Sequence, residues 1–257
     1  MNTYALITGA SSGIGLEFAH IFAQDHINLI LVARSIEKLE SIKKELRKQH
    51  NIDIHVIGLD LSKPESIQTL AQYTQDKKLE VKYLINNAWF GDYGSFIETD
   101  LDRNTDMIEL NITALTSLSR IYAEKMVKNG NGKILNVAST AAFQPGPNMA
   151  VYFATKSFVL SFSLALSEEL KWTGVTVTTL CPGPTESNFQ NQANANWIQI
   201  FKWKIPTSYE VAIYGYQKML NGNKIAIHWI MNNIKAFSVK FLPYSIQLIM
   251  LKKMNSK

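Results

Sequence analysis

Short apolar runs alternate with longer stretches of helical periodicity along most of the chain. The apolar runs are rich in β-branched residues: YALIT, NLILVA, IDIHVIGL, VKYLIN, GKILNVAS and GVTVTTL. Helical patterns follow at about residues 14–25, 35–49, 64–77, 102–129 and 150–172. Because the runs are apolar instead of alternating, we expect helices on both faces of the sheet. The order predicts an α/β fold, a Rossmann-type doubly wound parallel sheet in a single domain.

The pattern changes after the segment CPGPTES. Residues 188–210 are rich in Asn, Gln and Trp and have only a weak helical signal, so we expect a loop or lid over the substrate. Residues 211–257 mix aromatic and branched apolar residues with lysines. We therefore expect a cofactor-binding and catalytic domain over residues 1–190, a substrate loop over 188–210, and a basic helical C-terminal extension over 211–257.

Composition narrows the class of protein. A chain of 257 residues with 46% hydrophobic and 18% charged residues fits one large globular domain. The apolar run near the C-terminus spans 11 residues, well short of the ~20 that a membrane-spanning helix needs. The N-terminus lacks a signal-peptide pattern, and the single Cys181 suits a reducing cytoplasm. The five histidines form no metal-ligand set, so we expect no metal, and we expect no nucleic-acid partner.

The charge of the chain is concentrated at its C-terminal end. Glu210 is the last acidic residue, and residues 211–257 contain seven lysines. The rest of the chain carries 26 − 7 = 19 basic and 21 acidic residues, a net charge of −2. Three interpretations remain open for this tail: packing against the body or a second subunit, peripheral contact with an anionic membrane, or docking on an acidic partner such as an acyl carrier protein.

The segment TGASSGIG, residues 8–15, lies between the first predicted strand and the first predicted helix. Gly9 suits a tight turn, Gly13 lets the backbone approach a pyrophosphate, and Gly15 allows close packing of helix on strand. The free N–H groups of the helix start favour phosphate, so Ser11, Ser12 and Ile14 are also candidates. The alternative is a glycine-rich turn without a ligand.

The end of the second predicted strand indicates which dinucleotide binds. The segment LVARS places Arg34 there and no carboxylate. A guanidinium can pair with a 2′-phosphate, whereas an acid would repel it, so NADP(H) is favoured over NAD(H). Arg34 could instead be a solvated residue at the start of the next helix.

These features resemble the short-chain dehydrogenase/reductase family over roughly residues 3–190. The glycine spacing Gly-x3-Gly-x-Gly has that family's form. The other matching positions follow in the family's order: Asp60 and Leu61, Asn86 to Ala88, Asn111, Ser139, Tyr152 with Lys156, and the Pro182–Gly183 loop. The resemblance implies contacts to the cofactor from Asp60, Leu61, Asn87, Ala88, Pro182, Gly183, Thr185 and Ser187.

Three tyrosine–lysine pairs have the four-residue spacing that puts both side chains on one helix face. Tyr73 precedes the fourth strand and Tyr214 lies beyond the predicted sheet, so neither is expected to face a nicotinamide. Tyr152 and Lys156 follow the fifth strand and are the pair in a position to act.

The resemblance assigns roles to four residues. Tyr152 would donate a proton to the substrate carbonyl, and Ser139 would hydrogen-bond the same oxygen. Lys156 would bind the nicotinamide ribose, and Tyr152 would also contact the cofactor. The Lys156 ammonium would lower the pKa of the Tyr152 phenol. Asn111 would anchor a water in the proton relay.

One departure from the family pattern concerns the substrate pocket. Trp89 stands where the family usually has Gly, so its indole either points away, narrows the cleft or lines the pocket. Phe143 and Phe189 are expected to line the pocket as well, beside Ser139 and Tyr152. Aromatic walls nearly free of acids suit a bulky apolar substrate, steroid-like, fatty-acyl or aromatic. These aromatics could equally close the core.

The leading hypothesis is an NADP(H)-dependent oxidoreductase interconverting a carbonyl and a secondary alcohol. The alternative is an NADP(H)-binding sensor or scaffold protein without turnover. The family resemblance also implies a homodimer or homotetramer. We expect a cytoplasmic protein with a possible peripheral membrane contact.

Overall fold

The computed structural model describes residues 3–186, 205–238 and 242–254. Its centre is a seven-stranded sheet with the strand order β3-β2-β1-β4-β5-β6-β7, in which every neighbouring pair is parallel. The strands are β1 (Thr3–Thr8), β2 (Asn28–Ala33), β3 (Ile54–Gly58), β4 (Glu80–Asn86), β5 (Gly132–Val137), β6 (Val175–Cys181) and β7 (Ile225–Ile227). The six predicted strands are confirmed, and so is the parallel doubly wound sheet.

Helices connect the strands and also follow β7. They are α1 (Gly13–Gln24), α2 (Ile36–Gln49), α3 (Pro64–Asp76), α4 (Leu101–Ile108), α5 (Leu115–Lys128), α6 (Ala150–Glu169), α8 (Ser208–Leu220), α9 (Ile230–Ser238) and α10 (Tyr244–Met254). Helix α2 shows why such segments fold: Leu39, Ile42 and Leu46 recur on one face and are buried, while the opposite face is charged. The predicted helix over 102–129 is divided, because a π-helical segment, Glu109–Ala114, separates α4 from α5.

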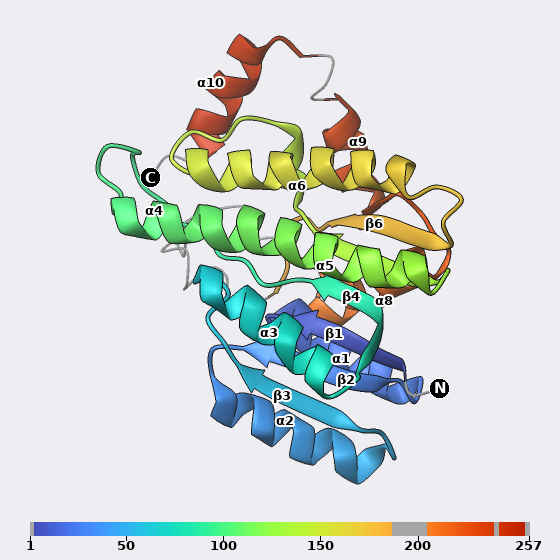
Figure 1. Ribbon diagram of the computed structural model, residues 1–257. Helices are drawn as coiled ribbons and strands as arrows, with labels where there is room; N and C mark the ends of the chain where they lie inside the picture. Colours follow the sequence, from blue (N-terminus) through green and yellow to red (C-terminus); the bar gives the residue numbers. More distant parts are fainter. Residues whose placement is uncertain (1–2, 187–204, 239–241, 255–257) are drawn as a thin grey trace.

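The helices cover both faces of the sheet, as the apolar strand pattern predicts. One hydrophobic core lies between the sheet and α1, α2 and α8, with Phe18 and Phe22 fully buried in it. A second core lies on the other face against α3 and α5 and includes Tyr122. Figure 1 shows α3, α5 and α6 side by side, with α9 and α10 at the top, outside α6.

The sheet extends beyond the boundary at residue 190 that the sequence indicated. Helix α8 packs on α1, and β7 pairs with β6 through Leu180 and Ala226, so residues 208–227 complete the sheet domain. Tyr214 therefore lies within the sheet domain, on the helix between β6 and β7, and not beyond the sheet. A three-residue strand is too short to show a hydrophobic pattern, which is why it was not predicted.

Helix α6 is long and apolar enough, by length and composition alone, to cross a membrane. It packs against β6 and against the short 3-10 helix η2 (Thr140–Phe143) that follows β5. Its apolar character is that of a helix flanking a buried sheet.

The chain reverses its direction of strand addition between β1 and β4. Strands β2 and β3 lie on one side of β1, and β4 to β7 lie on the other. At such a switch point the loops after the two central strands separate, and ligands bind in the resulting crevice at the carboxyl ends of the strands. The fold therefore places a binding site where the glycine loop follows β1 and residues 87–90 follow β4.

Candidate active site

The glycine turn after β1 has a backbone that only glycine accommodates easily. Gly9 and Gly13 have φ angles of +67° and +56°. A Cβ atom added to Gly15 would lie 2.3 Å from the carbonyl oxygen of Gly9, so α1 approaches the turn closely. The N–H groups at the start of α1 therefore lie next to a turn whose glycines carry no side chain, a cradle that fits a dinucleotide pyrophosphate.

The end of β4 holds this turn in place. The Asn87 side-chain amide donates to the carbonyl oxygens of Thr8 and Gly9 at 3.0 and 3.3 Å. The backbone N–H groups of Asn87 and Ala88 both donate to the Thr8 hydroxyl at 2.9 Å. Asn87 and Ala88 were expected to contact the cofactor, and in the structure they fix the loop that would bind it.

The other predicted cofactor residues surround the same edge. Arg34 is exposed immediately after β2, while Ser35 donates to the Glu37 carboxylate at 3.3 Å. Asp60 lies after β3, and its carboxylate accepts hydrogen bonds from the backbone and hydroxyl of Ser62 at 3.0 and 2.9 Å. Leu61 is buried in the second core.

Ser139 and Tyr152 meet at the carboxyl end of β5. The Ser139 hydroxyl lies close enough to the Tyr152 phenol to act on its pKa, and it accepts a hydrogen bond from the N–H of Ala141 at 3.1 Å. The N–H of Thr140 donates to the carbonyl oxygen of Pro182 at 2.8 Å, which ties the loop after β5 to the loop after β6. The predicted Pro182–Gly183 loop therefore lies beside Ser139.

Lys156 lies one helical turn after Tyr152 on α6 and is 1% exposed. Its ammonium nitrogen donates to the carbonyl oxygen of Val137 at 3.0 Å. The same nitrogen lies 4.3 Å from the ring centroid of Trp89 and 5.9 Å from that of Tyr152. The structure therefore brings the predicted pair together and adds Trp89 as a third member, stacked as a cation–π partner.

The electrostatics differ from the expectation that Lys156 lowers the pKa of Tyr152. Burial raises the pKa of Tyr152 to about 12, against the opposing effect of the Ser139 hydrogen bond. Burial also holds the pKa of Lys156 well below its ordinary value, with the nearby Cys181 acting in the other direction. Loss of hydration disfavours the charged form of both groups, so in the protein alone the phenol stays protonated.

Asn111 is positioned by the π-helical turn and is 1% exposed. Its side-chain oxygen accepts from the N–H of Phe90 at 3.2 Å, and its amide donates to the Phe90 carbonyl and the Thr155 hydroxyl, both at 3.0 Å. Asn111 thus links the loop after β4 to α6. The water-anchoring role expected of it stays a prediction.

The predicted substrate residues are only partly within the described chain. Trp89 is half-buried against Tyr152, with ring centroids 6.0 Å apart, and Phe143 packs beside the turn that carries Ser139. Thr185 is buried and its hydroxyl donates to the Gly183 carbonyl at 2.9 Å. Phe189 and Ser187 lie outside the described residues. The sequence analysis did not place Thr155 beside Asn111 or Cys181 beside Lys156, because no motif marks these contacts.

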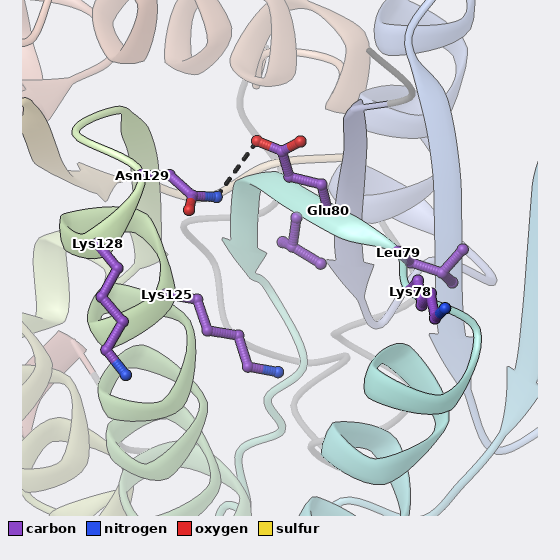
Figure 2. Close-up of a pocket in the computed structure, with 7 residues that line it drawn as sticks. Lys78, Leu79, Glu80, Lys125, Lys128 and Asn129 are labelled. Atoms are coloured by element: carbon purple, nitrogen blue, oxygen red, sulfur yellow. Dashed lines mark hydrogen bonds between the residues drawn. The ribbon is translucent and has the colours of Figure 1, made fainter.

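A surface cavity of about 350 Å³ lies at the opposite end of the sheet (Figure 2). Its lining includes Lys78 before β4 and Lys125 and Lys128 on the last turns of α5, and Asn129 donates to Glu80 at 3.3 Å. Lysines at a helix C-terminus complement the negative end of its dipole. Among the residues described, no group of His, Cys, Asp or Glu side chains could hold a metal ion.

The raised pKa of Tyr152 can be tested by ultraviolet titration. The difference at 295 nm between the wild-type protein and Tyr152→Phe should show no phenolate below about pH 10, because the phenol of an ordinary tyrosine ionises near ~10 and burial raises this one further. Tyr244→Phe, which removes a tyrosine that is 74% exposed, supplies the reference spectrum. Phenolate at neutral pH in the cofactor-free protein would contradict the structure.

Comparison with known proteins identifies relatives of this chain. The family model described as short chain dehydrogenase matches residues 3–197. Sulfoacetaldehyde reductase from Chromohalobacter salexigens is 35% identical over 196 residues, covering 74% of this chain and 75% of that protein. The very-long-chain 3-oxoacyl-CoA reductase of Vanderwaltozyma polyspora is 35% identical over 65% of this chain and 51% of its own length. The mouse 17-beta-hydroxysteroid dehydrogenase type 3 is 30% identical over 71% of this chain and 60% of its own length.

Solved structures agree with this assignment. A short-chain dehydrogenase from Sphingobium yanoikuyae in complex with NADPH superposes with a TM-score of 0.82 at 28% identity, covering 94% of both chains. A bulky-bulky ketone specific alcohol dehydrogenase from Comamonas testosteroni has a TM-score of 0.79 at 28% identity, covering 94% of this chain and 92% of that one. With the glycine cradle, the Ser139–Tyr152 contact and the buried Lys156, these matches show that the chain belongs to the short-chain dehydrogenase/reductase family.

Proposed function

We propose that this protein is an NADP(H)-dependent oxidoreductase that interconverts a ketone and a secondary alcohol on a bulky apolar substrate. The observation that carries the proposal is the placement of Ser139 beside the phenol of Tyr152 at the carboxyl edge of the sheet, with Lys156 one helical turn further along α6. Two hydroxyl groups converge there on one position, and both can donate to a carbonyl oxygen.

The charge state of Tyr152 indicates whether it can assist reduction of a ketone or oxidation of an alcohol. A phenol with a pKa of about 12 is protonated at neutral pH, so it can give its proton to the oxygen of a ketone as that oxygen becomes negative. Ser139 would donate a hydrogen bond to the same oxygen. A bound nicotinamide cofactor would supply or accept the hydride. Oxidation of an alcohol requires the phenolate instead, so the rate of oxidation should rise with pH.

Residues of the glycine cradle would hold the pyrophosphate, and Lys156 would hold the ribose next to the nicotinamide. The Lys156 nitrogen now contacts the Val137 carbonyl and the Trp89 ring. A ribose hydroxyl can contact the Lys156 nitrogen only if one of these two neighbours moves away. The indole of Trp89 is the movable neighbour, since the Val137 carbonyl belongs to the sheet.

Arg34 supports the preference for NADP(H). Its side chain is exposed at the carboxyl end of β2, where a 2′-phosphate of a bound dinucleotide would lie. The similar Sphingobium yanoikuyae protein was solved with NADPH. A guanidinium can bind phosphate through two parallel hydrogen bonds, and this geometry favours the phosphorylated cofactor.

The apolar substrate class rests on the aromatic side chains near Tyr152. Trp89 and Phe153 both lie with their ring centroids about 6 Å from the ring of Tyr152, at 6.0 and 5.9 Å. Similar proteins are described as a steroid dehydrogenase, a very-long-chain 3-oxoacyl-CoA reductase and a bulky-bulky ketone specific dehydrogenase. Phe189 and the rest of the expected lid would add further walls.

A second candidate function is NADP(H) binding without turnover, as in a sensor or scaffold protein. The observation that favours it is the stacking of Trp89 on Lys156, which competes with a ribose for the ammonium group. The placement of Ser139 beside Tyr152 favours catalysis, because cofactor binding alone does not require it.

Assembly and compartment are proposed along with the activity. Ile108 at the end of α4 and Phe158 on α6 are exposed apolar side chains, and we expect a homodimer or homotetramer to form through these two helices. The single cysteine, Cys181, is buried and unpaired, which is compatible with the reducing cytoplasm.

A panel of apolar ketones, followed by NADPH fluorescence with NADH as the control, tests the activity. The wild-type protein should consume NADPH with at least one bulky ketone, and Tyr152→Phe should lose at least about a hundredfold in kcat, because it lacks the proton donor. NADPH binding by the variant should stay close to wild type. Binding of NADPH without reduction of any ketone would favour the sensor or scaffold.

Charge reversal at Arg34 tests the cofactor preference. Arg34→Glu should raise the KM for NADPH by about thirtyfold, which corresponds to about 2 kcal/mol for a lost charged hydrogen bond. The KM for NADH should change little. Lys38→Glu, an exposed charge reversal one turn further along α2, is the matched control. Equal losses for NADPH in both variants would show that Arg34 has no specific contact.

Replacement of Trp89 tests its effect on the Lys156 ammonium. Trp89→Gly should bind NADPH about fivefold more tightly, because about 1 kcal/mol of contact between the indole and the Lys156 side chain no longer has to be displaced. Phe96→Gly introduces the same backbone freedom in the same loop without changing the contact to Lys156. Weaker binding by Trp89→Gly than by Phe96→Gly would mean that the indole forms part of the cofactor site.

A further inference from the structure

The two C-terminal helices present an apolar surface to solvent, which we call the tail face. On α9 it consists of side chains spaced at three and four residues: Ile230 (79% exposed), Met231 (58%), Ile234 (55%) and Phe237 (63%). On α10 its exposed members are Tyr244, Ile246, Leu248 and Ile249. A surface helix normally turns its apolar side to the protein, and here the apolar side is outward.

Helix α9 is fixed to the protein by its opposite side. Ala236 is buried in a cluster with Ala138, Cys181 and Ile227. Asn232 packs so closely on the Pro182–Gly183 loop that a Cβ atom on Gly183 would lie 2.6 Å from its side-chain nitrogen. The outward direction of Ile234 and Phe237 follows from this packing, because the small and polar residues take the inner face.

The inner side of α10 is equally defined. Gln247 and Leu251, four residues apart, are buried, and the Gln247 amide donates to the carbonyl oxygen of Leu242 at 2.8 Å. Leu248 and Ile249, which follow Gln247, are exposed. Figure 1 shows α9 and α10 together at one end of the molecule, beyond α6.

The charge of the segment complements an anionic partner. After Glu210 the chain contains seven lysines and no acidic residue, whereas the rest of the chain has a net charge of −2. Three of these lysines, at positions 235, 252 and 253, belong to α9 and α10. Exposed aromatic and aliphatic side chains together with lysines are the composition of a helix that lies in the interface of an anionic membrane.

We propose that the tail face binds the surface of an anionic lipid membrane. A second copy of this chain is a poorer occupant, because a symmetric contact between two tail faces would bring acid-free, lysine-bearing segments together. An acidic protein would be recognised mainly through charge, whereas the outward surface of α9 consists mainly of apolar side chains.

This surface is directly connected to the catalytic end of the sheet. The Pro182–Gly183 loop contacts Asn232 of α9 and also receives the hydrogen bond from Thr140, next to Ser139. If the protein reduces an apolar ketone, membrane docking would hold the catalytic residues near the lipid phase in which such a ketone is concentrated. This consequence rests on the proposed function, but docking itself does not.

Co-sedimentation of the full chain with vesicles tests the docking. The protein should pellet with vesicles containing phosphatidylglycerol and phosphatidylcholine, pellet weakly with phosphatidylcholine alone, and be released in part by high salt. Phe237→Glu should lower the partition coefficient at least about tenfold, because it places a charge in the apolar face. Removal of the lysines in the variant Lys235→Gln, Lys252→Gln, Lys253→Gln should lower it by about fivefold per lysine that lies at the membrane surface.

Phe96→Glu is the matched control for Phe237→Glu. Phe96 is 62% exposed and lies in the loop between β4 and α4, so both variants replace an exposed phenylalanine by a carboxylate. Binding retained by Phe96→Glu and lost by Phe237→Glu supports the proposal. Equal binding by both variants, or equal loss in both, overturns the assignment to the tail face.

Two further measurements separate this proposal from its competitors. Light scattering of the soluble protein shows whether Phe237→Glu converts an oligomer into a monomer. If it does, and the wild type does not bind vesicles, a second copy of the chain covers the tail face. The absence of vesicle binding alone also overturns the proposal. Turnover of a water-soluble ketone should be unchanged in Phe237→Glu, so loss of docking and loss of the proposed activity are recorded independently.

Discussion

The burial of Tyr152 and Lys156 against the end of β5 is the constraint on which the chemistry of this protein depends. The two side chains are 6% and 1% exposed, and loss of hydration favours the neutral form of each. The protein alone therefore does not hold a phenolate ready. Protonated Tyr152 is suited to give a proton to a ketone, and an ionised Tyr152 would need positive charge that a bound oxidised nicotinamide can bring. Because burial keeps Tyr152 protonated, binding of an oxidised cofactor would lower the pKa of Tyr152.

Several short contacts make the site one rigid unit around this pair. Thr8 and Asn87 connect the glycine turn to the end of β4, and Asn111 connects the next residues of that loop to α6. Trp89 lies between these fixed points, over Lys156. The indole at this position covers the Lys156 side chain in the structure. Helix α9 contacts the Pro182–Gly183 loop through Asn232 on its inner side, so the helix that carries the outward apolar face adjoins the candidate active site.

Much of the architecture could be predicted from local patterns. Six strands, the helices between them and the position of the glycine turn follow from hydrophobic periodicity and from glycine spacing, which are properties of neighbouring residues. β7 could not be predicted, because three residues show no period, and Tyr214 was consequently placed outside the sheet. The π-helical turn at Asn111 could not be predicted either, because it changes the hydrogen bonds of a helix but not its apolar pattern.

The sequence by itself determined the fold class, the family pattern and the identity of Ser139, Tyr152 and Lys156 as a set, since these depend on the order and spacing of residue types. Only the tertiary structure decided what surrounds that set. Contacts between segments far apart in the chain produce three features: the raised pKa of Tyr152, the position of Trp89 over Lys156 and the outward apolar side of α9. Hydration and contact are properties of the packed neighbourhood, and no local pattern encodes them.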